Sequence, residues 1–169
     1  MNYFEVFDIP VQLVIDKAEL KKKYFELSRR HHPDYFIQEE LVAQQQALEQ
    51  SAVINKAFKT FSNRDETIKY VLELKGLLTV NEKYDLPPEF LMEMMELNES
   101  LAEAQFDPGE RAAVLQKVVQ TEAELYQPVK EIIEQYREGE TSNTALRQVK
   151  DYYFKKKYLE RLKQQLAEK

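Results

Sequence analysis

The stretch KAELKKKYFELSRRHHPD, residues 17–34, predicts how the N-terminal part of this chain folds. Asp16 precedes it, and Glu19 follows three residues later, which is the spacing of a helix capping box. Largely apolar side chains then follow at spacings of four, three and four residues, which places them on one helical face: Leu20, Tyr24, Leu27 and His31. Pro33 ends the helix, because proline has no N–H and disfavours the α conformation of the residue before it. We therefore predict a helix that stops at a rigid turn, His32-Pro33-Asp34.

The remaining faces of this helix are basic, although the whole chain has a net charge of −6. Against two Glu stand six basic side chains: Lys17, Lys21, Lys22, Lys23, Arg29 and Arg30. A basic helix followed at once by His-Pro-Asp, with a long helix behind it, resembles the J-domain family. The resemblance implies that this region docks on the ATPase domain of an HscA/DnaK-type chaperone and stimulates its ATP hydrolysis. The chaperone-binding residues that it implies are His32, Pro33, Asp34, Lys21, Lys22, Lys23, Arg29 and Arg30.

Composition indicates an all-α protein with short connections, because the 169 residues include only 3 Gly and 6 Pro. The absence of cysteine excludes a disulfide scaffold, a thiol nucleophile and thiolate-bound metal sites. No apolar run approaches the ~20 residues of a membrane span. The opening residues MNYFEVFDIP lack the basic and apolar regions of a signal peptide, so we expect a cytoplasmic protein.

Further helices flank the basic one. Tyr3, Phe4 and Phe7 predict a short first helix over residues 2–8, and a third helix is expected over 39–61. We assign its inward side to Leu41, Leu48, Ile54, Phe58 and Phe61. Its segment AVINKAFKTF (52–61) resembles the J-domain helix that pairs antiparallel with the basic one. A fourth helix should end near Lys75, with Gly76 as the residue after its C-cap.

The chain divides into three segments: a J-domain over residues 1–75, a linker over 76–87 and an antiparallel three-helix bundle over 88–169. The linker is not rich in Gly or Ser, and three of its leucines could be buried: Leu77, Leu78 and Leu86. We therefore expect the two domains to hold a fairly fixed relation.

The bundle is predicted from three amphipathic stretches with short connections. The first helix covers about 88–105. The second begins after Asp107 as N-cap, is kinked by Pro128 and ends at Gly139. The third reaches Ala167. The inward stripes of the second and third helices are Leu115, Val118, Leu125, Val129, Ile132 and Tyr136, and Val149, Tyr152, Leu159, Leu162 and Leu166.

The first bundle helix, FLMEMMELNESLAE (90–103), carries more apolar surface than packing requires. One complete core stripe is Phe90, Met94, Leu97 and Leu101. Off that stripe lie Leu91, Met92, Met95, Glu96, Glu99 and Glu103. Exposed Leu and Met flanked by carboxylates suit a partner that has a hydrophobic groove and a basic rim. On the third helix, Phe154 should point outward as an aromatic anchor beside this face.

The order of these features resembles the HscB (Jac-type) family of J-domain co-chaperones along essentially the whole chain. The segments that carry the resemblance are YFEVFDIP, HHPDYF, QQSAVINKAFKTF and FLMEMMELNESL. It implies a non-enzymatic adaptor without cofactor that brings the iron–sulfur scaffold protein IscU to HscA. The scaffold-binding residues that it implies are Leu91, Met92, Met95, Glu96, Glu99, Glu103 and Phe154. We expect the protein to be monomeric on its own.

Three other functions are to be compared with this one. A J-domain co-chaperone for a different client would share every feature of the first domain. A nucleic-acid binder could use the basic helix, but the net negative charge and the lack of a stacking platform oppose it. Catalysis or metal binding finds little support, because His31 and His32 diverge by ~100° on a helix and no third ligand or nucleophile pairs with them.

Overall fold

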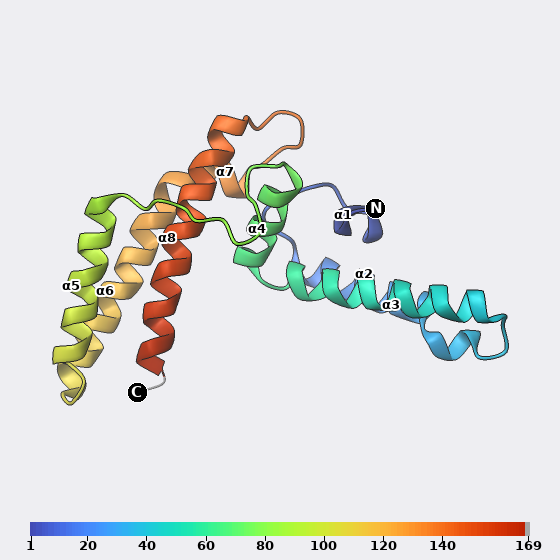
Figure 1. The fold of residues 1–169 in the computed structure, drawn as a ribbon, viewed down its shortest axis with the longest axis horizontal. Helices are drawn as coiled ribbons and strands as arrows, with labels where there is room; N and C mark the ends of the chain where they lie inside the picture. The colour runs from blue at the N-terminus through green and yellow to red at the C-terminus, as the bar shows by residue number, and fades with distance from the viewer. Residues whose placement is uncertain (168–169) are drawn as a thin grey trace.

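The computed structural model describes residues 1–167, with side chains to residue 165, and every regular element in that range is helical (Figure 1). The N-terminal elements are α1 (Tyr3–Val6), α2 (Lys17–His31), the 3₁₀ helix η1 (Pro33–Phe36), α3 (Leu41–Phe61) and α4 (Arg64–Leu74). The C-terminal elements are α5 (Pro88–Glu103), α6 (Pro108–Tyr126), the 3₁₀ helix η2 (Gln127–Val129), α7 (Lys130–Glu134) and α8 (Asn143–Ala167). The prediction of an all-α fold is confirmed.

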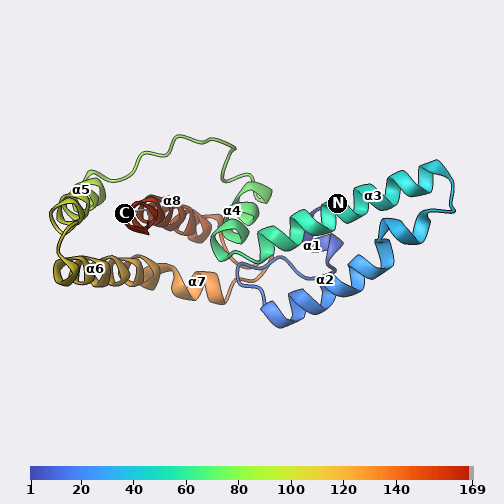
Figure 2. The same ribbon diagram turned by 90° about the horizontal axis from the view of Figure 1, so that it is seen from below.

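Helices α2 and α3 form an antiparallel hairpin that projects from the rest of the molecule (Figures 1 and 2). The predicted cap starts α2, since Asp16 Oδ1 accepts the Glu19 N–H at 3.0 Å. The two helices are joined by stacking of Tyr24 on Phe58, with ring centroids 4.0 Å apart. The Tyr24 hydroxyl also donates to Asn55 Oδ1 at 2.8 Å. The predicted pairing of α2 with α3 is therefore confirmed.

The outer half of this hairpin extends beyond the hydrophobic core. Ile54 is buried in α3, but Leu41 is 81% exposed and Leu48 is 55% exposed. The prediction that these two leucines face inward is therefore wrong. Helix α1 contacts α3, and the 3₁₀ helix η1 packs on α3 near the turn, but neither element covers Leu41 and Leu48.

Helices α5, α6 and α8 form the predicted bundle, and Figure 2 views them end-on. Asp107 caps α6, as predicted, by accepting the Gly109 N–H at 2.9 Å. Pro128 interrupts this same second helix, as predicted, because α6 gives way there to η2 and then to α7. The predicted end at Gly139 is wrong, since α7 stops at Glu134 and Gly139 lies in the following loop with φ +84°.

Leu115 also departs from its predicted place, because it is 42% exposed. The buried side of α6 runs through Val118 and Thr121. Around the helix axis, Leu115 is displaced from Val118 by about 60° in the direction away from Thr121, so it lies at the edge of the buried side. The predicted inward residue Leu166 lies outside the described side chains. The stripe of α8 is confirmed at Val149 and Leu159, which are fully buried. On α7, Ile133 is buried at 1% exposure, whereas the predicted Ile132 is only partly buried.

The N-terminal part and the bundle share one hydrophobic core at the junction of α4 and α8. Ile68, Val71 and Leu72 of α4 are each 0% exposed. They belong to the same cluster as Val149, Tyr152 and Tyr153 of α8. Linker residue Leu78 is buried too, at 6% exposure. The division into residues 1–75, 76–87 and 88–169 stays a proposal, and this shared core supports the expectation of a fixed relation.

An ion network reinforces the same junction. Lys156 Nζ of α8 lies 2.8 Å from Asp65 Oδ2 of α4 and 3.3 Å from Glu122 Oε1 of α6. It also lies 3.2 Å from Glu160 Oε1. Burial alone would lower the pKa of Lys156, but the surrounding carboxylates, Asp65 above all, raise it overall. A single cation therefore ties the three helices together.

Candidate protein-binding sites

The His32–Asp34 loop forms an exposed corner at the far end of the hairpin (Figure 1). His32 has an extended backbone, φ −65° and ψ 129°, as expected for a residue that precedes proline. Its Nδ1 accepts the Asp34 N–H at 3.1 Å, and its carbonyl accepts the Tyr35 N–H at 3.1 Å. The side chains of His32 and Asp34 are nevertheless 51% and 78% exposed. The loop is thus internally fixed and open to a partner.

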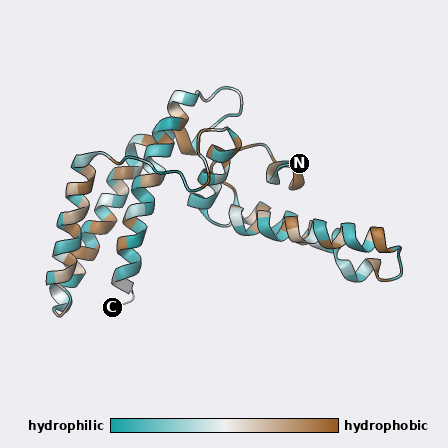
Figure 3. Cartoon of the chain, in the orientation of Figure 1, coloured by the Kyte–Doolittle hydropathy of each residue, from teal (hydrophilic) through white to brown (hydrophobic). Residues whose placement is uncertain are grey.

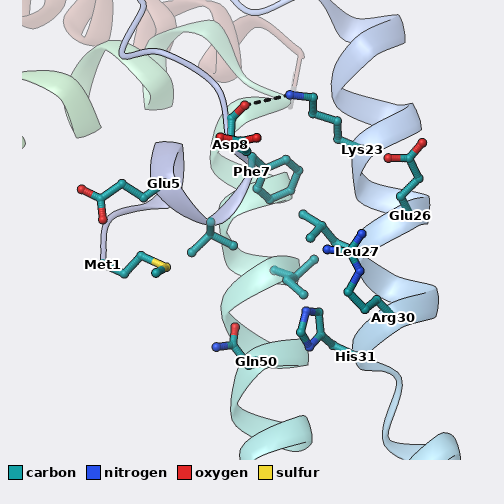
Figure 4. A pocket seen from close by; sticks show the side chains of 12 residues that line it. Met1, Glu5, Phe7, Asp8, Lys23, Glu26, Leu27, Arg30, His31 and Gln50 are labelled. Atoms are coloured by element: carbon teal, nitrogen blue, oxygen red, sulfur yellow. Dashed lines mark hydrogen bonds between the residues drawn. The ribbon is translucent and has the colours of Figure 1, made fainter.

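The predicted basic residues do not share one surface. Lys21, Lys22 and Arg29 are exposed. Lys23 is only 27% exposed, because its Nζ donates to the Asp8 carbonyl at 2.9 Å (Figure 4). Arg30 is exposed but lines, with Lys23 and His31, a cavity of about 410 Å³ between α1, α2 and α3 (Figure 4).

Lys23 therefore helps to hold the end of α1 against α2, while part of its ammonium group remains exposed. Its predicted role in chaperone binding stays a prediction, at a side chain that is less exposed than its neighbours. The outward basic surface consists of Lys21, Lys22 and Arg29, with Arg30 at its edge.

Sequence reasoning missed the apolar side chains around the corner. Their exposed fractions range from 52% for Phe25 to 81% for Leu41. The set comprises Phe25, Tyr35, Ile37, Leu41, Val42 and Leu48. Hydrophobic colour at the start of α3 marks part of it in Figure 3. A local signal was available in the sequence. Ile37, Leu41 and Val42 flank a polar turn at the end of the hairpin, where few other residues could cover them. Exposed apolar groups beside a charged loop are typical of a protein-binding surface.

The second predicted surface lies on α5, at the other end of the molecule (Figure 1). The core stripe is confirmed, with Met94 0% exposed and Leu97 1% exposed. Met92 and Met95 are 64% and 61% exposed, and Leu91 is partly exposed. The carboxylates Glu96, Glu99 and Glu103 are exposed as well. We call the set Leu91, Met92, Met95, Glu96, Glu99 and Glu103 the acidic face.

Phe154 differs from its prediction. It is half-buried, because the ring of Tyr84 stacks on it with centroids 4.5 Å apart and an interplanar angle of 5°. Tyr153 contacts it edge-on, with centroids 5.2 Å apart. The ring is therefore less exposed than the predicted outward position implies, although it remains partly exposed. Tyr84 lies 70 residues earlier in the chain, and helical periodicity within α8 carries no information about it.

Among residues 1–167, each helix lacks an apolar stretch of the length that a membrane crossing requires. Within the described side chains, no three His, Asp or Glu gather closely enough to hold a metal ion. His31 is half-buried beside the cavity of Figure 4.

Comparison of the sequence with known proteins identifies relatives of one kind. A family model described as the HSCB C-terminal oligomerisation domain matches residues 86–167. The Co-chaperone protein HscB homolog of Vibrio cholerae is 38% identical over 102 residues, which are 60% of each chain. The homolog of Acinetobacter baumannii is 40% identical over 104 residues, 62% of this chain and 58% of the relative. The chain thus spans about 60% of the length of the curated relatives it matches.

Solved structures resemble the chain over nearly its whole length. Chaperone HscB from Vibrio cholerae superposes with a TM-score of 0.79 at 27% identity, covering 99% of this chain and 96% of that one. Human co-chaperone protein HscB superposes with a TM-score of 0.83 at 26% identity, covering 99% of this chain and 81% of that one. The resemblance includes the N-terminal hairpin as well as the bundle.

Proposed function

We propose a function from the premise that this chain belongs to the HscB family of co-chaperones. The His32–Asp34 loop and the outward basic surface of α2 stimulate the ATPase of an HscA/DnaK-type chaperone. The acidic face of α5, together with Phe154, holds an IscU-type iron–sulfur scaffold protein as client. The chain itself performs no chemistry, uses no cofactor and acts as a monomer in the cytoplasm.

The main observation in favour of chaperone binding is that the rigid His-Pro-Asp corner is exposed. Its two internal hydrogen bonds, from Asp34 N–H and Tyr35 N–H, leave the Asp34 carboxylate 78% exposed. A loop that is already ordered loses little conformational entropy on binding. To stimulate hydrolysis, the loop must bind the hydrolysis-competent arrangement of the chaperone more tightly than the resting one.

The apolar side chains around the corner support the same half of the proposal. Phe25 is 52% exposed on α2, and Tyr35 is 68% exposed directly after the loop. Lys22 and Arg29 are three and four residues from Phe25 in α2, so they lie on the same side of the helix. An interface built this way would combine steering by cations with burial of apolar surface.

The acidic face supports the client half. Helix α5 carries five Glu and no basic residue. Its two exposed methionines, Met92 and Met95, add flexible apolar groups that adapt to a partner's groove. A scaffold protein with a hydrophobic groove and a basic rim complements both properties.

Covalent connection of the two surfaces explains why one chain carries both. Binding the client on the bundle raises its effective concentration at a chaperone bound to the hairpin. The shared core at α4 and α8 supports this role, because a fixed junction holds the two surfaces in one geometry.

One experiment separates the two halves. Asp34→Asn should abolish stimulation of the chaperone ATPase while leaving scaffold affinity unchanged. Met92→Ala should weaken scaffold binding by about 1–3 kcal/mol while the scaffold-free ATPase stimulation stays the same. Steady-state ATPase rates and titration calorimetry measure the two effects.

Matched controls exist for both variants. Glu40→Gln removes a nearby exposed carboxylate that makes no capping hydrogen bond, and Val119→Ala removes an apolar group that is 59% exposed on α6. Both should behave as the unchanged protein does. Full stimulation by Asp34→Asn would refute the chaperone half. If Asp34→Asn loses stimulation but the unchanged protein does not bind the scaffold, the chain would be a J-domain co-chaperone for a different client.

A further inference from the structure

The linker is attached to α8 just before α5 begins. Glu82 Oε2 lies 2.7 Å from Lys150 Nζ, and the two side chains are only 21% and 18% exposed. The Thr79 N–H also donates to Glu82 Oε1 at 3.1 Å, so the linker turn presents this carboxylate to α8. The backbone two residues before Tyr84 is therefore held against α8.

Tyr84 itself makes three contacts with α8. Its ring stacks on Phe154, with centroids 4.5 Å apart, and its hydroxyl donates to Asp151 Oδ1 at 2.8 Å. Lys150 Nζ lies 5.7 Å from the centroid of the Tyr84 ring. Burial and the bond to Asp151 raise the pKa of Tyr84 to about 12, so the hydroxyl remains a donor at neutral pH.

Phe154 is consequently held between two tyrosines. Tyr84 covers one face of its ring, and Tyr153, buried at 5% exposure, meets it at an interplanar angle of 73°. Because Phe154 is still partly exposed with Tyr84 in place, the ring remains accessible without movement of the linker. An anchor residue that is already fixed loses little rotamer entropy when a partner buries it.

We propose that Tyr84 is a positioning residue for the anchor Phe154, and that the linker thereby forms part of the scaffold-binding surface. This inference rests on the proposed function. Tyr84 stays on α8 when the scaffold binds, because its release would break the stack on Phe154 and the hydrogen bond to Asp151 together.

The test measures scaffold affinity in the full-length protein. Tyr84→Ala should raise the dissociation constant for the IscU-type scaffold by about threefold to tenfold, the range that loss of one aromatic pair produces. Tyr84→Phe keeps the ring and should stay within about twofold of the unchanged protein. Val119→Ala, at a side chain that is 59% exposed on α6, should leave scaffold affinity unchanged.

A double-mutant cycle separates positioning from a general loss of structure. In a Phe154→Ala background, Tyr84→Ala should have no further effect on affinity, because its action passes through Phe154. The NMR signals of the Phe154 ring should also move in Tyr84→Ala and remain in place in Tyr84→Phe. If Tyr84→Ala proves too unstable to measure, Tyr84→Leu removes the stacked ring while retaining apolar volume, and the same loss of affinity is expected.

The outcomes distinguish the two proposals. Unchanged affinity in Tyr84→Ala, or tighter binding because the ring is uncovered, would overturn the positioning role alone, provided that Phe154→Ala still weakens binding. Unchanged affinity in Phe154→Ala would instead remove Phe154 from the client-binding surface and with it the basis of this inference.

Discussion

The outer half of the α2–α3 hairpin and the α4–α8 junction use similar residue types in opposite ways. At the hairpin end, apolar and charged side chains are exposed, such as Leu41 at 81% and the Asp34 carboxylate at 78%. At the junction, Ile68 and Val71 are fully buried and Lys156 is surrounded by carboxylates of the same chain. At the junction the molecule satisfies its own groups, whereas at the hairpin end it leaves them exposed, which supports the proposed role of that end in binding.

The contrast has an energetic consequence. A side chain that is packed by its own chain contributes to folding, whereas an exposed one contributes little until something binds it. Substitutions at the junction should therefore lower the free energy of unfolding, and substitutions at the hairpin end should change binding. Three measurements test this division.

The largest effect is expected from a pair of leucines. Leu72→Ala should lower the free energy of unfolding by about 2–5 kcal/mol, because Leu72 is 0% exposed in the shared core. Leu48→Ala, at 55% exposure in α3, should stay within about 0.5 kcal/mol. Denaturant unfolding followed by circular dichroism measures both. Similar losses in the two variants would contradict the division.

A pair of neighbouring lysines gives a smaller effect. Lys156→Met should destabilise the fold by about 2 kcal/mol, because it leaves three carboxylates beside a side chain position that is only 12% exposed. Lys157→Met changes the adjacent exposed lysine and should have almost no effect. Thermal unfolding of both variants makes the comparison. Equal stability of the two would mean that the ion network does not hold the junction.

The smallest effect is a dependence on pH at the linker. The hydrogen bond and charge of Lys150 lower the pKa of Glu82 below its ordinary value of 4.5. The pair of Glu82 with Lys150 therefore contributes its full stability above pH 4.5, and this contribution is lost as the pH falls through the lowered pKa of Glu82 in the folded protein. Between pH 6 and pH 3, roughly, Glu82→Gln should lose less stability than the unchanged protein, by under about 1 kcal/mol. Identical pH profiles would show that the linker is not held by this pair.

Local sequence signals predicted the elements that carry the two surfaces. The capping residues Asp16 and Asp107 start α2 and α6, and both make the expected hydrogen bonds. Pro33 ends α2 and leaves the His32–Asp34 loop exposed. The stripe through Met94 and Leu97 left Met92 and Met95 outside the bundle core. Each of these features depends on residues within about one helical turn, so the sequence contains the necessary information.

The tertiary structure alone decided which neighbour covers each face. Periodicity assigned Leu48 to the inward side of its helix, but the side chain is 55% exposed, because the described elements leave that side largely uncovered. The same pattern placed Lys23 on a basic face and Phe154 on an outward one, whereas contacts with Asp8 and Tyr84 occupy them. Helical spacing specifies the direction in which a side chain leaves its own helix. It does not specify what lies there, because that depends on packing between segments far apart in the chain.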